Sequence, residues 1–434
     1  MKSFKIILAV LLSLVAAGLL VMTALVLMDP IRLENRQPTT LQTDAIFVPQ
    51  EPEELPEEVV PEEEEAPEEE APAEEPPAEE VPVEEVPEEV KKASSYLSGM
   101  TEEEKLWQLF LVTPENLTGV GLATRAGEAT KEALEKKPVG GLCYFAANLE
   151  DREQVVELLS NTQSYAKTPL FLGLDEEGGA VSRAGSNEAL GVTKFEAAAE
   201  YGKRADMAEV YQVGETMAKE LTALGFNLNF APVADVLVEP ENTEIGSRAY
   251  SSDPSVTSAM VAAMVQGLQQ GGMASCLKHF PGHGSTLTDS HEGTAVSQRT
   301  VEELRQVEWE PFRSGIEKGV SLVMLSHLTN PNLSEKPASL SAEVVGMLRE
   351  ELGFGGVIIT DSMQMGAITE HYDSGEAAVL ALEAGADMIM IPADLQAAYD
   401  GVKQALTDGR LTWEAVDQHV LRILTAKYQM GIMA

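Results

Sequence analysis

One stretch of the chain, residues 278–291, concentrates side chains that bind hydroxyls or anions and move protons near neutral pH. It holds three of the six histidines of the chain. Proline and glycine in its middle exclude a helix, so a loop is expected after a short buried strand. Its chemical groups are Lys278, His279, His283, Asp289 and His291. This combination predicts an active site.

Two of these residues form a pair suited to proton transfer. Asp289 and His291 are two positions apart, so in an extended loop they point the same way. The carboxylate can orient the imidazole and stabilise its charged form, which leaves the second ring nitrogen free to exchange a proton. The alternative is a turn aspartate beside a surface histidine.

A zinc site is a second alternative for this stretch. His279 and His283, with His291, have ligand-like spacing, but that spacing suits a helix and Pro281 interrupts it. No metal is therefore expected.

The elements that must position these groups follow from the hydrophobic pattern. Short apolar runs alternate with amphipathic segments, which indicates eight strands with intervening helices and an α/β fold of the (β/α)8 TIM barrel type. A capping box of Thr101 with Glu104 begins the first short helix. The predicted strands cover residues 108–112, 140–145, 170–174, 227–231, 275–279, 321–326, 356–360 and 387–391. The longer predicted helices cover residues 206–224, 254–270, 300–318 and 341–352.

Five of the predicted strands end in polar or ionisable groups. Catalytic residues of such barrels collect at the C-terminal strand ends, although a single aspartate there is often a helix N-cap. The strand ends carry Asp175, Asp235, Lys278 with His279, Ser326 with His327, and Asp361. Together with Arg183 and Arg248, these groups suit a polyhydroxylated sugar. Cleavage of a glycosidic bond with retention needs a carboxylate nucleophile and a proton donor, and Asp361 is the candidate nucleophile.

The N-terminal segment, residues 1–95, has a different composition. Residues 6–28 carry no charge and follow two lysines, which predicts a membrane anchor over residues 1–28, with a cleaved signal peptide as the alternative. Residues 29–95 read as a disordered Glu/Pro-rich linker, because residues 51–90 hold 20 glutamates and nine prolines and no lysine or arginine. The catalytic domain is expected over residues 96–434. The formal charge of −41 excludes nucleic acid as a partner.

Cys143 and Cys276 fall in two separate predicted strands. We expect them to pack in the core rather than to form a disulfide or bind a metal, because free cysteine is among the most buried residue types.

From about Leu97 onward the chain resembles glycoside hydrolase family 3, in particular its single-domain β-N-acetylhexosaminidases. The motifs that carry the resemblance are Leu174-Asp-Glu-Glu-Gly-Gly, Asn229-Phe-Ala-Pro-Val-Ala-Asp235, Ile245-Gly-Ser-Arg248, Lys278-His-Phe-Pro-Gly-His-Gly284, Asp289-Ser-His291, Ser326-His327, Pro337-Ala-Ser-Leu-Ser341 and Ile359-Thr-Asp-Ser-Met-Gln-Met365. The resemblance implies Asp361 as nucleophile and His291, paired with Asp289, as general acid/base. It also implies a terminal sugar subsite built from Asp175, Arg183, Arg248, Lys278 and His279, with no metal or organic cofactor.

Three positions depart from the family pattern, which often has Gln at Glu176, Arg at Ala180 and Asp at Ser285. These departures concern contacts at the rim of the site and the leaving-group preference rather than the chemistry. The further domain of family β-glucosidases is not expected here, so the proton donor is expected from the barrel.

The expected protein is a membrane-tethered monomer with an extracellular catalytic domain, or a secreted one if the N-terminal segment is cleaved. It is expected to remove β-linked N-acetylglucosamine from peptidoglycan fragments such as muropeptides. Phosphorolysis, β-glucosidase activity and non-catalytic wall binding are the alternatives.

Overall fold

The computed structural model describes residues 86–287, 293 and 295–434. The chain divides into two units, Met1–Glu80 and Val81–Ala434, and every described residue lies in the second unit, which is compact. The predicted anchor over residues 1–28, most of the linker, and both Asp289 and His291 lie outside the described residues. No helix within the described ranges is long and apolar enough to cross a membrane.

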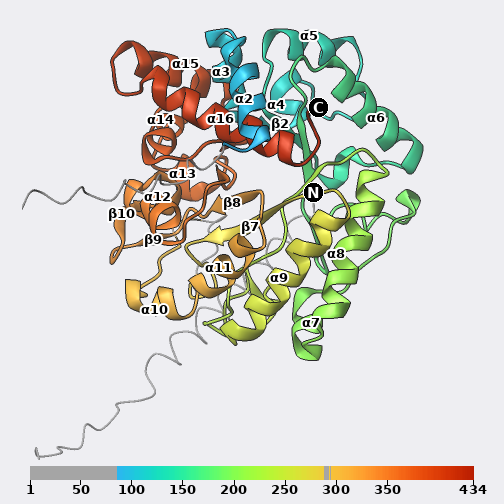
Figure 1. Cartoon of the computed structure of the whole chain (residues 1–434), viewed down its shortest axis with the longest axis vertical. Coiled ribbons are helices and arrows are strands. Elements are labelled where there is room, and N and C mark those ends of the chain that lie inside the picture. Colours follow the sequence, from blue (N-terminus) through green and yellow to red (C-terminus); the bar gives the residue numbers. More distant parts are fainter. Residues whose placement is uncertain (1–85, 288–292, 294) are drawn as a thin grey trace, which may run out of the picture. The chain divides into compact units, whose positions relative to one another are not determined.

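Eight parallel strands form the centre of the second unit, and helices surround them (Figure 1). They are β1 (Phe110–Val112), β2 (Gly141–Cys143), β3 (Phe171–Leu174), β6 (Leu228–Asn229), β7 (Ala274–Phe280), β8 (Leu322–Leu325), β11 (Val357–Thr360) and β12 (Ile389–Met390). Each lies within or overlaps a predicted strand, so all eight predictions are confirmed. Their spatial order is β11-β8-β7-β6-β3-β2-β1-β12.

A backbone bridge brings the two end strands of this sheet together. Ile359 of β11 pairs in parallel with Met388, which directly precedes β12. The Thr360 N–H donates to the Met388 carbonyl at 3.1 Å, and the Met388 N–H donates to the Ile358 carbonyl at 3.1 Å. The sheet is therefore a nearly closed parallel barrel, as the alternation of strands and helices predicts.

The helices bury one apolar face against the barrel. The longest are α6 (Arg152–Tyr165), α8 (Met207–Thr222), α9 (Pro254–Gln270), α14 (Ser374–Ala384), α15 (Leu395–Thr407) and α16 (Trp413–Gln429). Shorter helices are α3 (Glu102–Gln108), α4 (Pro114–Thr118), α5 (Glu128–Lys136), α7 (Ala198–Arg204) and α13 (Gly366–Thr369). Thr101 and Glu104 form the predicted capping box at the start of α3, which satisfies backbone donors that the first turn leaves free.

Two predicted helices differ from a single α-helix. Residues 300–318 form α10 (Val301–Gln306) and α11 (Trp309–Glu317) with a break at Val307. Pro311 explains the break. It has no N–H to donate to the carbonyl of Val307, four positions earlier, and its ring would clash with that carbonyl in a continuous helix. Residues 341–352 form α12 (Ala342–Gly346) and then a π-helical turn, η5 (Met347–Glu351).

The folded domain begins earlier than predicted. Helix α2 (Glu88–Ser98) occupies residues that the composition assigns to the linker, and it lies beside α16 (Figure 1). Ala93 and Leu97 on its inner face are buried in the common core. The predicted boundary at residue 96 therefore falls inside α2, because these apolar side chains have a surface to pack against that the composition alone does not reveal.

Cys143 of β2 and Cys276 of β7 are both free and fully buried. The expectation of core packing is confirmed for both. Burial raises the pKa of each thiol above its ordinary value, which keeps them neutral and unreactive.

The N-terminal face of the barrel holds a separate charged network. Asp387 precedes β12 and accepts hydrogen bonds from Arg349 at 2.5 Å, Arg422 at 2.7 Å and His419 at 2.9 Å. Its carboxylate also accepts the Ile358 N–H at 2.8 Å. Burial would raise the pKa of Asp387, but these donors outweigh it and lower the pKa. This network ties α16 and the segment before β11 to the barrel.

Candidate active site

The first group of site residues follows β3 and is held by a tight hairpin. β4 (Glu176–Gly178) pairs with β5 (Val181–Ser182), and Gly178 and Gly179 form the turn with φ of 88° and 59°. A Cβ on Gly178 would lie 2.4 Å from the Glu196 carbonyl, so the turn requires glycine for space as well as for φ. The hairpin returns Arg183 to Asp175, with Nη2 of Arg183 3.6 Å from the carboxylate.

Glu176 stabilises this hairpin from within. Its buried carboxylate accepts hydrogen bonds from the Ser182 hydroxyl and from the Ala184 N–H, the latter at 2.7 Å. Its backbone exchanges hydrogen bonds with the side chain of Asn229 on β6, at 3.0 and 2.8 Å. Burial raises the pKa of Glu176. The residue therefore supports the loop on which Arg183 lies.

The neighbouring carboxylate, Glu177, points to the opposite side and joins two cations. Its Oε1 lies 2.6 Å from Nζ of Lys278. Arg248 donates to it through two N–H groups, each at 2.9 Å, in a bidentate pair. Burial would raise the pKa of Glu177, but Lys278 and Arg248 outweigh it and lower the pKa to about 2. The carboxylate is ionised throughout the physiological range.

Lys278 connects this pair to Asp175. It projects from β7, its side chain is 3% exposed, and Nζ lies 2.7 Å from Oδ1 of Asp175. Burial would lower the pKa of Lys278, but Asp175 and Glu177 outweigh it and raise the pKa. The same balance, dominated by Glu177, raises the pKa of Arg248. Four predicted sugar-binding residues thus meet at one end of the barrel: Asp175, Arg183, Arg248 and Lys278.

His279, the fifth predicted sugar-binding residue, is oriented by Asp235. Its Nδ1 lies 2.7 Å from Oδ2 of Asp235, so the ring donates there and turns Nε2 toward Arg248, 3.4 Å away. Burial would raise the pKa of Asp235, but the attraction of His279 outweighs it and lowers the pKa. Asp235 therefore acts as the carboxylate that fixes this imidazole.

His283 belongs to the structure of the turn. Its backbone N–H donates to Asp235 at 2.6 Å, and its Nδ1 lies 2.9 Å from the hydroxyl of Thr286. The side chain of Asn242 donates to its carbonyl at 2.9 Å. In the described part of the chain, no three His, Cys, Asp or Glu side chains gather as metal ligands would. The third histidine of the zinc alternative, His291, lies outside that part.

Asp361 follows β11 and lies at the same end of the barrel. Its backbone N–H donates to the Leu325 carbonyl at 2.8 Å, and its Oδ1 accepts the Ser362 N–H at 2.7 Å. Burial would raise the pKa of Asp361, but attraction to His279, the Ser362 N–H and Lys278 outweighs it and lowers the pKa. An ionised carboxylate at this position is what a nucleophile requires.

His327 supports the turn that carries Asp361. It is fully buried; Nε2 lies 3.0 Å from the Ser362 carbonyl and Nδ1 lies 2.7 Å from the Ser339 hydroxyl. Because a carbonyl only accepts, Nε2 carries the proton toward Ser362, and the Ser339 hydroxyl donates to Nδ1 in the neutral ring. Burial lowers the pKa of His327, which agrees with this neutral form.

None of the three strand-end aspartates, Asp175, Asp235 and Asp361, caps a described helix; those caps are other residues. The N-cap alternative is therefore wrong for these positions.

The predicted proton donor, His291, and its partner Asp289 remain a prediction because both lie outside the described residues. The chain on either side of them is held in place. Ser285 and Ser297 approach to 3.0 Å through their hydroxyl groups, and the Ser297 N–H donates to the Thr329 carbonyl at 3.0 Å.

Sequence reasoning missed Glu177 as a site residue. A signal was present, because Glu177 and Asp175 are two positions apart in an extended segment and so share a side. What the sequence could not indicate is that Arg248 would lie against Glu177 rather than face the sugar alone.

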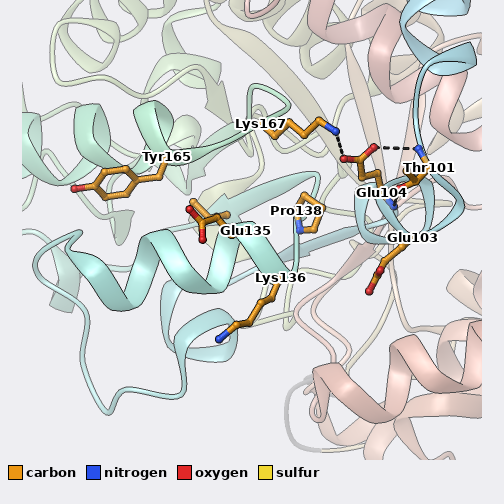
Figure 2. A pocket seen from close by; sticks show the side chains of 9 residues that line it. Thr101, Glu103, Glu104, Glu135, Lys136, Pro138, Tyr165 and Lys167 are labelled. Atoms are coloured by element: carbon orange, nitrogen blue, oxygen red, sulfur yellow. Dashed lines mark hydrogen bonds and ion pairs between the residues drawn. The ribbon is translucent and has the colours of Figure 1, made fainter.

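A cavity of about 490 Å³ lies away from this chemistry. Its lining comes from segments that precede β1, β2 and β3, which places it at the N-terminal face of the barrel. Figure 2 shows Lys167 and Thr101 converging on Glu104, while Lys136 extends away from them. The concentration of perturbed ionisable groups, not the size of a cavity, identifies the active site here.

Residues 101–426 match the family described as glycosyl hydrolase family 3 N terminal domain. Because the match covers most of the chain, the protein belongs to this family, an enzyme family of the glycoside hydrolase class. A β-hexosaminidase of Stenotrophomonas maltophilia is 36% identical over 278 residues, which cover 63% of this chain and 82% of that protein.

Solved structures agree with this assignment. A family 3 β-N-acetylglucosaminidase from a Paenibacillus species superposes with a TM-score of 0.73 at 35% identity, covering 77% of this chain and 64% of that one. This chain thus spans just under two thirds of the Paenibacillus protein. A β-glucoside phosphorylase superposes with a TM-score of 0.70 at 26% identity, covering 81% of this chain and 62% of that one. The predicted barrel and the predicted family are therefore both confirmed.

Proposed function

We propose that the protein is an exo-acting, retaining β-N-acetylhexosaminidase that removes terminal β-linked N-acetylglucosamine. The proposal is carried by the lowered pKa of Asp361 and by its place at the same end of the barrel as Asp175, Lys278 and Arg248. Charged groups of both signs distinguish the hydroxyl positions of a sugar and hold its anomeric carbon near the nucleophile. The β-hexosaminidase relatives support N-acetylglucosamine as that sugar.

In the proposed reaction the Asp361 carboxylate attacks the anomeric carbon and the glycosidic C–O bond breaks. His291, oriented by Asp289, gives its proton to the leaving oxygen. The neutral imidazole then takes a proton from water, whose oxygen attacks the glycosyl ester and releases Asp361. Two inversions leave the sugar in its original β configuration.

Turnover of aryl β-N-acetylglucosaminides tests both roles. Asp361→Asn removes the nucleophilic charge and is expected to abolish turnover; wild-type turnover in this variant contradicts the mechanism. His291→Ala is expected to slow substrates with poor leaving groups most, because these depend on protonation. An equal effect across all leaving groups would remove His291 from the role of acid.

Phosphorolysis is the second candidate, favoured by the likeness to a β-glucoside phosphorylase. A histidine acid/base does not repel phosphate as a carboxylate would. Assays with and without phosphate separate the two, because phosphorolysis yields a sugar 1-phosphate. A parallel panel of β-glucosides tests the β-glucosidase alternative. Binding of muropeptides without any turnover would favour a non-catalytic wall-binding protein.

The cellular setting is proposed from composition. The uncharged run over residues 6–28 supports a single membrane anchor, and the acidic linker supports a spacer that presents the catalytic domain to peptidoglycan fragments outside the cell. Fractionation of cells that express the full chain tests this. Activity that stays with membranes supports an anchor, activity in the medium supports cleavage, and activity in the cytoplasm contradicts both.

A further inference from the structure

Glu177 is more enclosed than Asp175, the other carboxylate that contacts Lys278. Its Oε1 faces Lys278 at 2.6 Å, and both of its oxygens receive Arg248 N–H groups at 2.9 Å. Its side chain is 5% exposed, against 15% for Asp175. These charged donors occupy the carboxylate, so it has little capacity left for a sugar hydroxyl.

Among the described residues, Glu177 is the only carboxylate that contacts both Lys278 and Arg248. Asp175 lies beside Lys278 and Arg183, whereas Glu177 lies beside Lys278 and Arg248. Lys278 and Arg248 repel each other, and burial disfavours the charge on both. One buried negative charge between them holds the two cations together.

We propose that Glu177 is a positioning residue of the reaction: it fixes Lys278 and Arg248 in the geometry and charge state that bind the sugar, without touching the sugar itself. This inference rests on the proposed function for the sugar subsite. In this arrangement Asp175 is the carboxylate that faces the substrate and Glu177 the carboxylate that lies beneath it. The Arg248 guanidinium, held at Nε and Nη2, keeps its contact with His279 at 3.4 Å.

The isosteric variant Glu177→Gln tests the charge. An amide accepts from one cation through its oxygen but presents N–H groups to the other, so Lys278 and Arg248 separate. We expect kcat/KM to fall about 100-fold, chiefly through a higher KM, because charge-assisted hydrogen bonds to both cations are lost. The basic limb of kcat/KM against pH should move to lower pH, since burial of Lys278 is then less well compensated.

Two further variants separate charge from simple structural damage. Glu177→Asp keeps the charge but shortens the reach, so we expect a loss of about 10-fold with the wild-type pH profile. Glu351→Gln makes the same chemical change in η5, before β11 and so away from the site, at a carboxylate to which Arg305 donates through two N–H groups at 2.6 and 2.9 Å. It should keep kcat/KM within about twofold of wild type.

The measurement is kcat/KM from about pH 5 to pH 10 on the β-glycoside that the wild type hydrolyses fastest in the panel. A wild-type KM and pH profile in Glu177→Gln would overturn the proposal. Should Glu177→Gln fail to fold, full activity in Glu177→Asp would overturn it instead. If the wild type prefers glucosides, the proposed function fails while the test of Glu177 proceeds on the glucoside.

Discussion

Replacement of Lys427 by methionine should stabilise the protein and change how its stability depends on pH. Lys427 lies on α16 and is fully buried at the N-terminal end of the barrel. Its Nζ donates to Oε1 of Gln108 at 2.8 Å and lies 5.3 Å from the centre of the Phe171 ring. Burial lowers the pKa of Lys427 from 10.5 to about 7.

The sign of the effect follows from proton binding. Between about pH 7 and pH 10.5 the unfolded chain keeps a proton on Lys427 that the folded chain has released, so stability rises with pH across this window. Below about pH 7 both states are protonated and the cost of the buried charge is complete. The separation of the two pKa values corresponds to roughly 5 kcal/mol.

Methionine has nearly the same length and shape but no charge. The substitution leaves Oε1 of Gln108 without a hydrogen-bond donor, which costs about 1–3 kcal/mol. We therefore expect a net gain in the free energy of unfolding of roughly 2–4 kcal/mol near pH 6.5. Between about pH 6.5 and pH 9.5 the wild type should gain roughly 3 kcal/mol relative to Lys427→Met.

Urea unfolding of the full chain at several pH values provides the assay, with Lys403→Met as the matched control on the exposed side of α15. The control should stay within about 0.5 kcal/mol of wild type at every pH. A destabilised Lys427→Met, or a difference from wild type that is constant with pH, would refute the reasoning.

Three more outcomes follow from the geometry. Asp387→Asn should cost about 3 kcal/mol of stability by urea unfolding, because it leaves the partly buried Arg349 and Arg422 without their carboxylate, while the folded fraction keeps its kcat. Gly178→Ala should raise KM by about 10-fold and lower the melting temperature, because a Cβ cannot fit 2.4 Å from the Glu196 carbonyl; unchanged kinetics would show that the hairpin does not position Arg183. His327→Ala should reduce kcat about 10-fold with little change in KM, because it frees the turn after Asp361; a change in KM alone would contradict this positioning role.

The barrel and the sugar-binding cluster were accessible from the sequence for a physical reason. Buried parallel strands read as short apolar runs, and polar residues directly after them must gather at one end of the barrel. Asp175, Lys278 and Asp361 are found in this way, because their placement depends on local position within one strand.

Features that depend on distant contacts were not accessible. The bidentate pair of Glu177 and Arg248 joins residues 71 positions apart, and neither residue alone reveals the other. Helix α2 forms within a charged segment because α16 offers an apolar surface to it. The break at Val307 could have been predicted from a local rule, because Pro311 lies four positions later. The prediction of one helix over residues 300–318 instead followed the apolar periodicity.

The most direct test of the central claim is to identify the residue that bonds to the sugar. Incubation with a 5-fluoro-N-acetylglucosaminyl fluoride, which slows the second step more than the first, should trap the glycosyl enzyme. Peptide mass spectrometry is then predicted to find one sugar adduct, an ester on Asp361. An adduct on another residue, or continued hydrolysis of the trapping reagent by Asp361→Asn at the wild-type rate, would contradict the account.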